Sequence, residues 1–290
     1  MASVGIIGAG NMGLAMALRL IDRDWSVAVR DIDPAREALA RQHGAQVHAE
    51  ASSLARASTL LIVAVVDAGQ TREVLLGPSG ALHGLAPGAA VLLCPTIAPD
   101  DVQTLAEQLT AGGWHAVDAP MSGGPARARD GSMSMMVACS DAAFQAASGL
   151  LADLSSRLFR VGTKAGDGAR TKLVNNLLAT VNLVGAAEAL DLARRLGLDE
   201  QRTVDVIEQS SGQSWIGIDR LRRYVAADPA VHAHGALLAK DSALALEAAR
   251  RVGCSPTIGT HAAAVFAAAC AQGLDRQDDA LLCRWLSQQP

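Results

Sequence analysis

The chain of 290 residues is half apolar, 19% charged and carries a formal net charge of −4. A chain of this length and composition is typical of a globular protein with two domains and a sizeable core. Its slight acidity argues against a nucleic-acid partner, since a nucleic-acid groove must neutralise several phosphates and no run of Lys or Arg here is longer than a pair.

The cysteines and the N-terminus indicate a cytoplasmic protein. Five cysteines, odd in number and widely spaced, fit neither a disulfide framework nor a zinc site. No basic segment precedes the first apolar stretch, so we expect no export signal. The longest apolar tract, residues 173–192, is interrupted by Asn, Glu and Asp, which would be costly in a lipid bilayer. We therefore expect a buried helix there and no membrane partner.

Short apolar runs alternate with helical patterns through roughly the first 160 residues, as in successive βαβ units. The runs are continuously apolar, which indicates a parallel sheet covered by helices on both faces. We therefore predict an α/β fold whose N-terminal part is a doubly wound, mostly parallel Rossmann sheet. The expected strands are residues 4–8, 26–30, 59–66, 89–94 and 114–119, with 132–139 and 157–162 extending an edge on either side of a helix near 141–154.

Strand patterns disappear from residue 163 onward. A Gly-rich turn precedes a long interdomain helix, expected at about residues 169–196. We thus predict an NAD-binding domain at residues 1–162 and an all-helical domain for substrate binding and oligomerisation at residues 163–290. Its further helices are expected near 200–209, 216–225, 236–252, 256–272 and 277–287.

A glycine-rich turn, GAGNMG, follows the first expected strand and opens a helix, as the dinucleotide-binding fingerprint requires. Gly8 permits the tight turn, Gly10 lets the backbone approach a pyrophosphate, and Gly13 lets the helix lie close to the strand. Its place in the first strand–turn–helix favours cofactor binding over a structural turn. We expect cofactor contacts from Gly8, Gly10, Asn11, Met12 and Gly13.

An acidic residue follows the second expected strand. Asp31 lies 18 residues beyond Gly13, near the spacing at which a carboxylate binds the adenosine ribose hydroxyls. We expect cofactor contacts from Asp31 and Ile32. The carboxylate of Asp31 would repel a 2′-phosphate, and Ile32 stands where an NADP-binding chain usually carries Arg. NAD is therefore expected over NADP, although Arg30 and Arg36 keep NADP open because either could reach a phosphate.

Four separated blocks of the sequence resemble the β-hydroxyacid dehydrogenase family, which includes 3-hydroxyisobutyrate dehydrogenases, L-threonate dehydrogenases and tartronate semialdehyde reductases. They occur in the family's order and read GIIGAGNMGLAMALRL at 5–20, DAPMSGGPARARDGSMSMMV at 118–137, GDGARTKLVNN at 166–176 and LLAKDSALAL at 237–246. The resemblance implies hydride transfer between a nicotinamide cofactor and a short β-hydroxy acid.

The cofactor edge departs from the usual pattern of this family. Val65-Val66-Asp67 replaces a common Leu-Pro, and Cys94-Pro95-Thr96 replaces a common Ser-Ser-Thr. The hydroxyl of Thr96 is retained, and Gln70 supplies a polar group nearby. We accordingly expect cofactor contacts from Val65, Val66, Gln70 and Thr96.

Oxidation of an alcohol by hydride transfer needs a group that takes the hydroxyl proton, and Lys172 is the expected general acid/base. It stands in an apolar helix four residues before Asn176, so both lie on one helix face. A closed site and a positively charged nicotinamide would both disfavour the ammonium form. The resemblance gives this Lys the catalytic role; the alternative is a Lys that reaches solvent. Asn176 is expected to orient Lys172 and substrate, although Asn175 is the other candidate.

Ser122, Gly123 and Gly124 follow a strand at the carboxyl edge of the sheet, where doubly wound folds bind ligands. Two glycines expose successive backbone N–H groups and the hydroxyl adds a donor, which together suit a substrate carboxylate. The resemblance places Lys240 beside the nicotinamide, with a salt bridge as the alternative. Trp215 is expected either in the core or as a wall of the substrate site.

Other functions fit less well. Scattered histidines argue against a metal site, and the chain has no Gly-x-Ser-x-Gly motif of a hydrolase. The alternatives are an imine reductase of the same architecture and a dinucleotide-binding module without turnover. The choice among hydroxyisobutyrate, threonate, glycerate and serine stays open, because one methylene or hydroxyl contact shifts preference by about 1–3 kcal/mol. The Ala-rich helical domain leaves apolar surface, so a homodimer or homotetramer is expected.

Overall fold

The computed structural model describes residues 3–289 and divides into two compact units, Met1–Lys172 and Leu173–Pro290. The division falls inside the long helix α8 (Asp167–Arg195), later than the boundary at residue 162 that the sequence suggests. The reason is that the start of α8 packs on the N-terminal unit, where Ala169 is buried in the hydrophobic core.

In the described part of the N-terminal unit, nine strands form one sheet in the order β3-β2-β1-β4-β5-β6-β8-β7, with β9 beside β8. The first six strands in this order, from β3 through β1 to β6, are all parallel, which confirms the mostly parallel sheet. Strand β8 runs antiparallel to β6 and carries β9 at its side, so the two later predicted strands do extend an edge. The strands are β1 (Ser3–Ile7), β2 (Ser26–Arg30), β3 (Gln46–Val47), β4 (Leu60–Val63), β5 (Ala90–Leu93), β6 (His115–Asp118), β7 (Met121–Ser122), β8 (Ser134–Ala138) and β9 (Arg157–Gly162).

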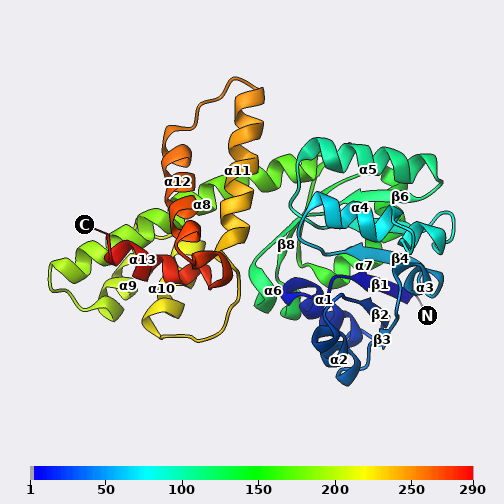
Figure 1. Ribbon diagram of the computed structural model, residues 1–290, viewed down its shortest axis with the longest axis horizontal. Coiled ribbons are helices and arrows are strands. Elements are labelled where there is room, and N and C mark those ends of the chain that lie inside the picture. The colour runs from blue at the N-terminus through cyan, green and yellow to red at the C-terminus, as the bar shows by residue number, and fades with distance from the viewer. Residues whose placement is uncertain (1–2, 290) are drawn as a thin grey trace. The chain divides into compact units, whose positions relative to one another are not determined.

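Helices cover both faces of this sheet, as the continuously apolar strands predict (Figure 1). One core joins the sheet to α1 (Asn11–Ile21), α2 (Pro34–Gln42), α6 (Gly124–Asp130) and α7 (Asp141–Leu154). The other joins it to α3 (Ala51–Arg56), α4 (Ala68–Leu76) and α5 (Pro99–Ala111), with a 3₁₀ turn at Ala81–His83. The sequence analysis did not foresee β3, β7 or α6, because elements of two to seven residues carry too little periodicity.

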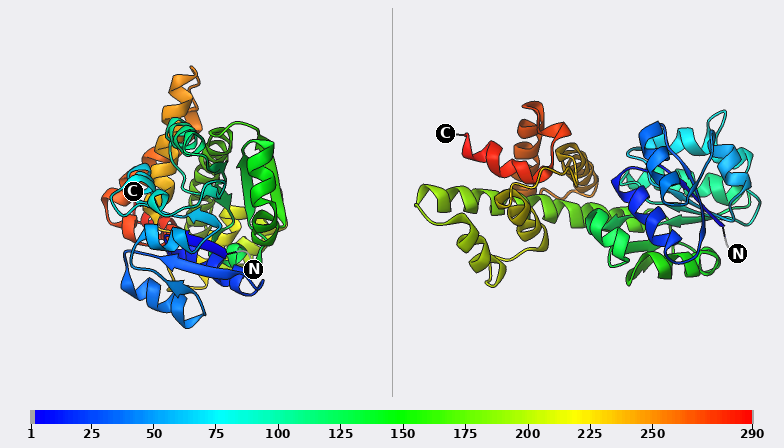
Figure 2. Two further views of the ribbon diagram at one scale, coloured as in Figure 1. Left: turned by 90° about the vertical axis from the view of Figure 1, so that its right-hand side faces the viewer. Right: turned by 90° about the horizontal axis from the view of Figure 1, so that it is seen from below.

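The described part of the C-terminal unit is helical, as predicted, and its helices lie on both sides of α8 (Figure 2). They are α9 (Glu200–Glu208), α10 (Trp215–Val225), α11 (Gly235–Arg251), α12 (Thr257–Ala271) and α13 (Leu282–Ser287), with 3₁₀ turns at Leu274–Arg276 and Asp279–Leu281. The helix expected at 277–287 was wrong in its first half. Asp278 accepts the N–H of Ala280 and begins a 3₁₀ turn there, so α13 starts only at Leu282.

The two adjacent acids before α13, Asp278 and Asp279, form buried ion pairs with arginines of α10. Asp279, fully buried, accepts Arg220 Nε at 2.8 Å and Nη2 at 2.9 Å. Asp278 accepts Arg223 Nη1 at 2.6 Å. Removing one partner of such a pair leaves an uncompensated charge, so these acids hold the 3₁₀ turn against α10.

Helix α8 has a buried and an exposed side. Leu183, Ala187 and Leu190 are fully buried in the core of the C-terminal unit, whereas Val174 and Leu178 are exposed. By length and composition alone α8 is apolar enough to cross a membrane. The prediction of a buried helix was wrong for one side of α8, because no residue among 3–289 covers Val174 and Leu178.

The glycines of the first turn have distinct steric roles that substitution separates. A Cβ on Gly13 would lie 1.8 Å from the carbonyl oxygen of Gly8, whereas a Cβ on Gly10 would meet no atom within 4 Å among the described residues. We expect Gly13→Ala to lower the free energy of unfolding by about 1–3 kcal/mol, since backbone must move. Gly10→Ala should change it by less than about 1 kcal/mol, because φ −61° suits Ala. Thermal unfolding of the two variants side by side measures this, and equal loss in both would contradict it.

Candidate functional site

The glycine turn between β1 and α1 has the geometry of a phosphate-binding loop. Gly8 adopts φ +96°, which favours glycine, and any Cβ there would lie 2.7 Å from the carbonyl oxygen of Ala64. The space above Gly10 is open and Gly10 is exposed. The half-buried Asn11 and Met12 and the buried Gly13 begin α1, whose N-terminal N–H groups and dipole favour an anion. The turn therefore fits the pyrophosphate of a dinucleotide.

Asp31 lies directly after β2, at the same edge of the sheet. Its Oδ2 accepts the N–H of Ala9 at 2.5 Å, and its Oδ1 accepts the N–H of Asp33 at 2.8 Å. The carboxylate is thereby fixed against the glycine turn, where the adenosine ribose of a bound dinucleotide would lie. The neighbouring Ile32 is 90% exposed, so its contact with a cofactor stays a prediction.

The remaining predicted cofactor contacts follow β4 and β5. Val65 is half-buried and Val66 exposed, and the N–H of Val66 donates to Oε1 of Gln70 at 3.0 Å. Gln70 therefore stabilises the loop between β4 and α4 through its Oε1. Thr96 is half-buried just beyond β5. All four residues lie at the carboxyl ends of parallel strands, where open α/β sheets bind ligands.

Ser122, Gly123 and Gly124 form the turn from β7 into α6. Gly123 has φ +129° and Gly124 has φ +72°, so both need the freedom of glycine. The three residues are half-buried. Successive N–H groups in such a turn can receive a carboxylate, which keeps the predicted role chemically sound.

Asp118 is a functional candidate that the sequence analysis passed over, although it opens the second family-like block. It ends β6 and is 1% exposed. Its Oδ2 accepts the N–H groups of Gly166 at 2.7 Å and Ala169 at 3.1 Å, at the start of α8. A Cβ on Gly168 would lie 2.8 Å from Asp118 Cγ, so glycine is needed for this approach. The signal available in the sequence was an acid ending an apolar strand.

Burial raises the pKa of Asp118 to about 6, although its hydrogen bonds from the backbone of α8 oppose that rise. In the unfolded chain the same carboxyl titrates near 3.8. The contribution of this group to stability is therefore full below about pH 4 and is lost as the pH rises through about 6. At neutral pH the protein keeps a costly buried charge beneath α8.

Lys172 lies on α8 three residues after Ala169 and is 8% exposed. The alternative of a Lys that reaches solvent does not describe this side chain. Asn176, one helical turn further along α8, is also buried at 6% exposure. Their placement on a single helix, four residues apart, puts both on one face.

Asn176 belongs to a network of hydrogen-bonded polar side chains in the C-terminal unit. Its Nδ2 donates to Asp241 Oδ2 at 2.6 Å, and its Oδ1 accepts Asn175 Nδ2 at 3.0 Å. Asp241 Oδ1 pairs with Lys240 Nζ at 2.8 Å. Asp241, buried at 6% exposure, was missed as a site residue although the Lys-Asp pair interrupting an apolar helix pointed to it. Asn175 is exposed, so of the two amides Asn176 is the one held in the interior.

Trp215 begins α10 and is 38% exposed, so it is not a core residue. The guanidinium of Arg220 lies 6.0 Å from its ring centroid. Such contact fixes the ring while leaving one side accessible. A role as a wall of the substrate site stays a prediction.

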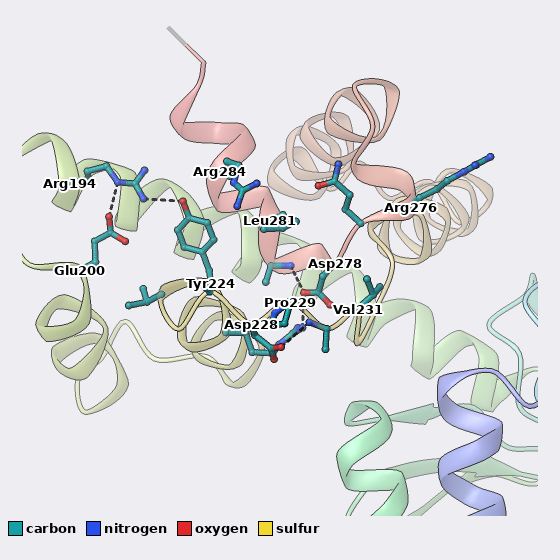
Figure 3. A pocket seen from close by; sticks show the side chains of 16 residues that line it. Arg194, Glu200, Tyr224, Asp228, Pro229, Val231, Arg276, Asp278, Leu281 and Arg284 are labelled. Carbon is teal, nitrogen blue, oxygen red and sulfur yellow. Dashed lines mark hydrogen bonds and ion pairs between the residues drawn. The ribbon is translucent and has the colours of Figure 1, made fainter. Parts of the chain in front are cut away.

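A pocket of about 470 Å³ in the C-terminal unit contains none of the predicted site residues (Figure 3). Its wall includes Arg194, Tyr224 and Asp278, and Arg194 Nε donates to Glu200 at 2.7 Å. The guanidinium of Arg223 is likewise held by Asp278. Arg276 and Arg284 also line this pocket, which lies apart from the predicted site residues and is not part of the candidate site.

Comparison with known proteins agrees with this geometry. The family model described as the NAD binding domain of 6-phosphogluconate dehydrogenase matches residues 3–162. The model described as NAD-binding of NADP-dependent 3-hydroxyisobutyrate dehydrogenase matches residues 166–286. L-threonate dehydrogenase of Escherichia coli K12 is 32% identical over 285 residues, which cover 98% of this chain and 94% of that enzyme.

Solved structures give the same result. A 3-hydroxyisobutyrate dehydrogenase from Salmonella typhimurium has a TM-score of 0.92 and 31% identity, covering 98% of this chain and all of that one. An imine reductase from Myxococcus stipitatus has a TM-score of 0.65 over 99% of each chain but is only 18% identical, which shows the fold alone. The chain therefore belongs to the β-hydroxyacid dehydrogenase family and is an oxidoreductase that uses a nicotinamide dinucleotide.

Proposed function

We propose that the protein oxidises a short β-hydroxy acid of the threonate or 3-hydroxyisobutyrate type with NAD, and that Lys172 is the general acid/base. The observation that carries the proposal is the burial of Lys172 one helical turn before the buried Asn176. A lysine is almost never buried unless it is paired or has a specific task. The L-threonate and 3-hydroxyisobutyrate dehydrogenases among its relatives support the substrate class.

The use of lysine in this chain supports the same role. Lysine occurs at positions 164, 172 and 240 among 25 basic residues, and the others are arginine. Arginine stays charged in proteins, whereas a lysine amine can lose and regain its proton. Lys164 is exposed, which leaves Lys172 and Lys240 as the two lysines within family-like blocks. An amine is thus present where a proton must move.

Each group then has one task in the proposed reaction. The glycine turn and Asp31 bind the dinucleotide, which when bound supplies the hydride acceptor. The hydroxyl of Ser122 and the N–H groups of Gly123 and Gly124 hold the substrate carboxylate. Lys172 takes the hydroxyl proton at Nζ during oxidation and returns it in the reverse direction. Asn176, fixed by Asp241, orients the substrate hydroxyl toward that amine.

A substrate panel tests the reaction class. We expect NADH formation from one or more of L-threonate, 3-hydroxyisobutyrate, glycerate and serine, because these acids share the carboxylate and β-hydroxyl that the proposed groups bind. Cyclic imines should not be reduced. Absorbance at 340 nm follows both directions. Turnover of imines without any turnover of hydroxy acids would establish the imine reductase instead, and NAD binding without turnover of the panel would favour the binding module.

Replacement of Lys172 tests the proposed general acid/base. We expect Lys172→Ala to lower kcat about 10²–10⁴-fold, the contribution usual for proton transfer by a positioned side chain. NAD affinity, measured by calorimetry, should stay within about twofold, since the dinucleotide binds at the glycine turn. Lys164→Ala is the matched control and should retain full activity, because Lys164 is exposed. Full turnover by Lys172→Ala would contradict the assignment.

We also propose that the exposed side of α8 is the contact between two copies of this chain. Val174, Leu178 and Leu192 are 73%, 60% and 58% exposed, and Leu196, just past the helix, is 66% exposed. The spacing of four, fourteen and four residues puts them along one side of the helix. An apolar stripe of this length is costly in water, and a second copy related by twofold symmetry would bury the same stripe.

The oligomeric state tests this contact. Light scattering of the wild type should give at least twice the chain mass of 29.9 kDa. We expect Leu178→Glu with Leu192→Glu to shift the mass to that of one chain, because two charges would be buried at the contact. Leu76→Glu, on α4 of the N-terminal unit, replaces another exposed leucine and should leave the mass unchanged. A wild-type protein that is monomeric and fully active would contradict the proposal.

A further inference from the structure

Glu37, in the first turn of α2, accepts hydrogen bonds from two donors at the end of β2. Its Oε1 accepts Arg30 Nη1 at 2.7 Å and the backbone N–H of Asp31 at 3.1 Å. The side chains of Glu37 and Arg30 are 16% and 28% exposed. An ion pair with this degree of burial is screened less by solvent than one on the open surface.

The position of Arg30 also bears on cofactor binding. Its guanidinium also contacts the carbonyl oxygen of Asp31, the residue whose carboxylate lies against the glycine turn. A guanidinium at this edge is the group that would bind a 2′-phosphate on the adenosine ribose. Glu37 pairs with the Arg30 guanidinium and holds it against the first turn of α2.

The second arginine near this edge is held differently. Arg36 Nη2 donates to the neutral Oδ1 of Asn11 at 3.3 Å. A neutral acceptor at that distance restrains a guanidinium less than a carboxylate at 2.7 Å does. Of the two arginines that could serve a phosphate, Arg30 is therefore the one that an acid withholds.

We infer that Glu37 is a specificity-determining residue that favours NAD over NADP by withholding Arg30 from a ribose 2′-phosphate. The inference rests on the proposed use of NAD and extends it to a residue outside the fingerprint. Asp31 repels a 2′-phosphate directly, whereas Glu37 acts by removing its cationic partner. The two effects are separable because they involve different side chains.

Glu37→Gln separates the charge from the hydrogen bond. Glutamine keeps an Oε1 that can accept the Asp31 N–H, while the ion pair with Arg30 is lost. We expect the affinity of the cofactor-free protein for NADP⁺, measured by calorimetry, to rise about tenfold relative to that for NAD⁺, the scale of one charged hydrogen bond. The affinity for NAD⁺ should stay within about twofold, and the gain for NADP⁺ should shrink as salt is raised.

Two controls define what overturns the inference. Arg30→Gln added to Glu37→Gln must remove the gain, and its persistence would overturn the role of Arg30. Glu107→Gln, an exposed position on α5, makes the same charge change and must leave the NADP⁺ to NAD⁺ ratio unaltered. An unaltered ratio in Glu37→Gln overturns the inference while the proposed function stands. Binding of neither dinucleotide by the wild type would instead overturn the proposed function, and the inference with it.

Discussion

The carboxylate of Asp118 joins the sheet to the first turn of α8, and the proposed chemistry depends on this contact. It ends β6 and accepts two N–H groups at the start of the helix that bears Lys172. This side chain therefore fixes the start of α8, shortly before the proposed general acid/base. A small displacement of this start would move the amine of Lys172, and catalytic geometry tolerates little displacement.

This contact is costly, which indicates that it serves position more than stability. The raised pKa of Asp118 means that its charged form is less favoured in the folded protein than in the unfolded chain. A hydrophobic residue at this place would avoid that cost but would leave the N–H groups of Gly166 and Ala169 without their acceptor. The chain also keeps glycine at 168, where a Cβ would collide with the carboxylate. A buried carboxylate and a glycine near the start of a helix are both unfavourable for stability, and such features are common at functional sites.

The sequence was sufficient to predict features that are formed by residues close together in the chain. The glycine turn, the acid after the second strand and the helical second unit each follow from a pattern within one short segment of the chain. It was insufficient where partners are distant in the chain. The contacts of Asp118 with Gly166 and of Asn176 with Asp241 join residues 48 and 65 positions apart. Neither periodicity nor spacing reports such a contact, so Asp118 and Asp241 were left out and the exposed side of α8 was read as buried.

Several arginines of this chain are paired with acids of their own unit, which bears on how the proposed site would bind anions. Arg30 is held by Glu37, Arg220 by Asp279 and Arg223 by Asp278. These guanidinium groups are committed to acids of the same unit, so they orient elements instead of ligands. In the proposed reaction the pyrophosphate and the substrate carboxylate would bind to the N–H groups of the two glycine-containing turns and to the dipole of α1, which need no counter-charge of their own.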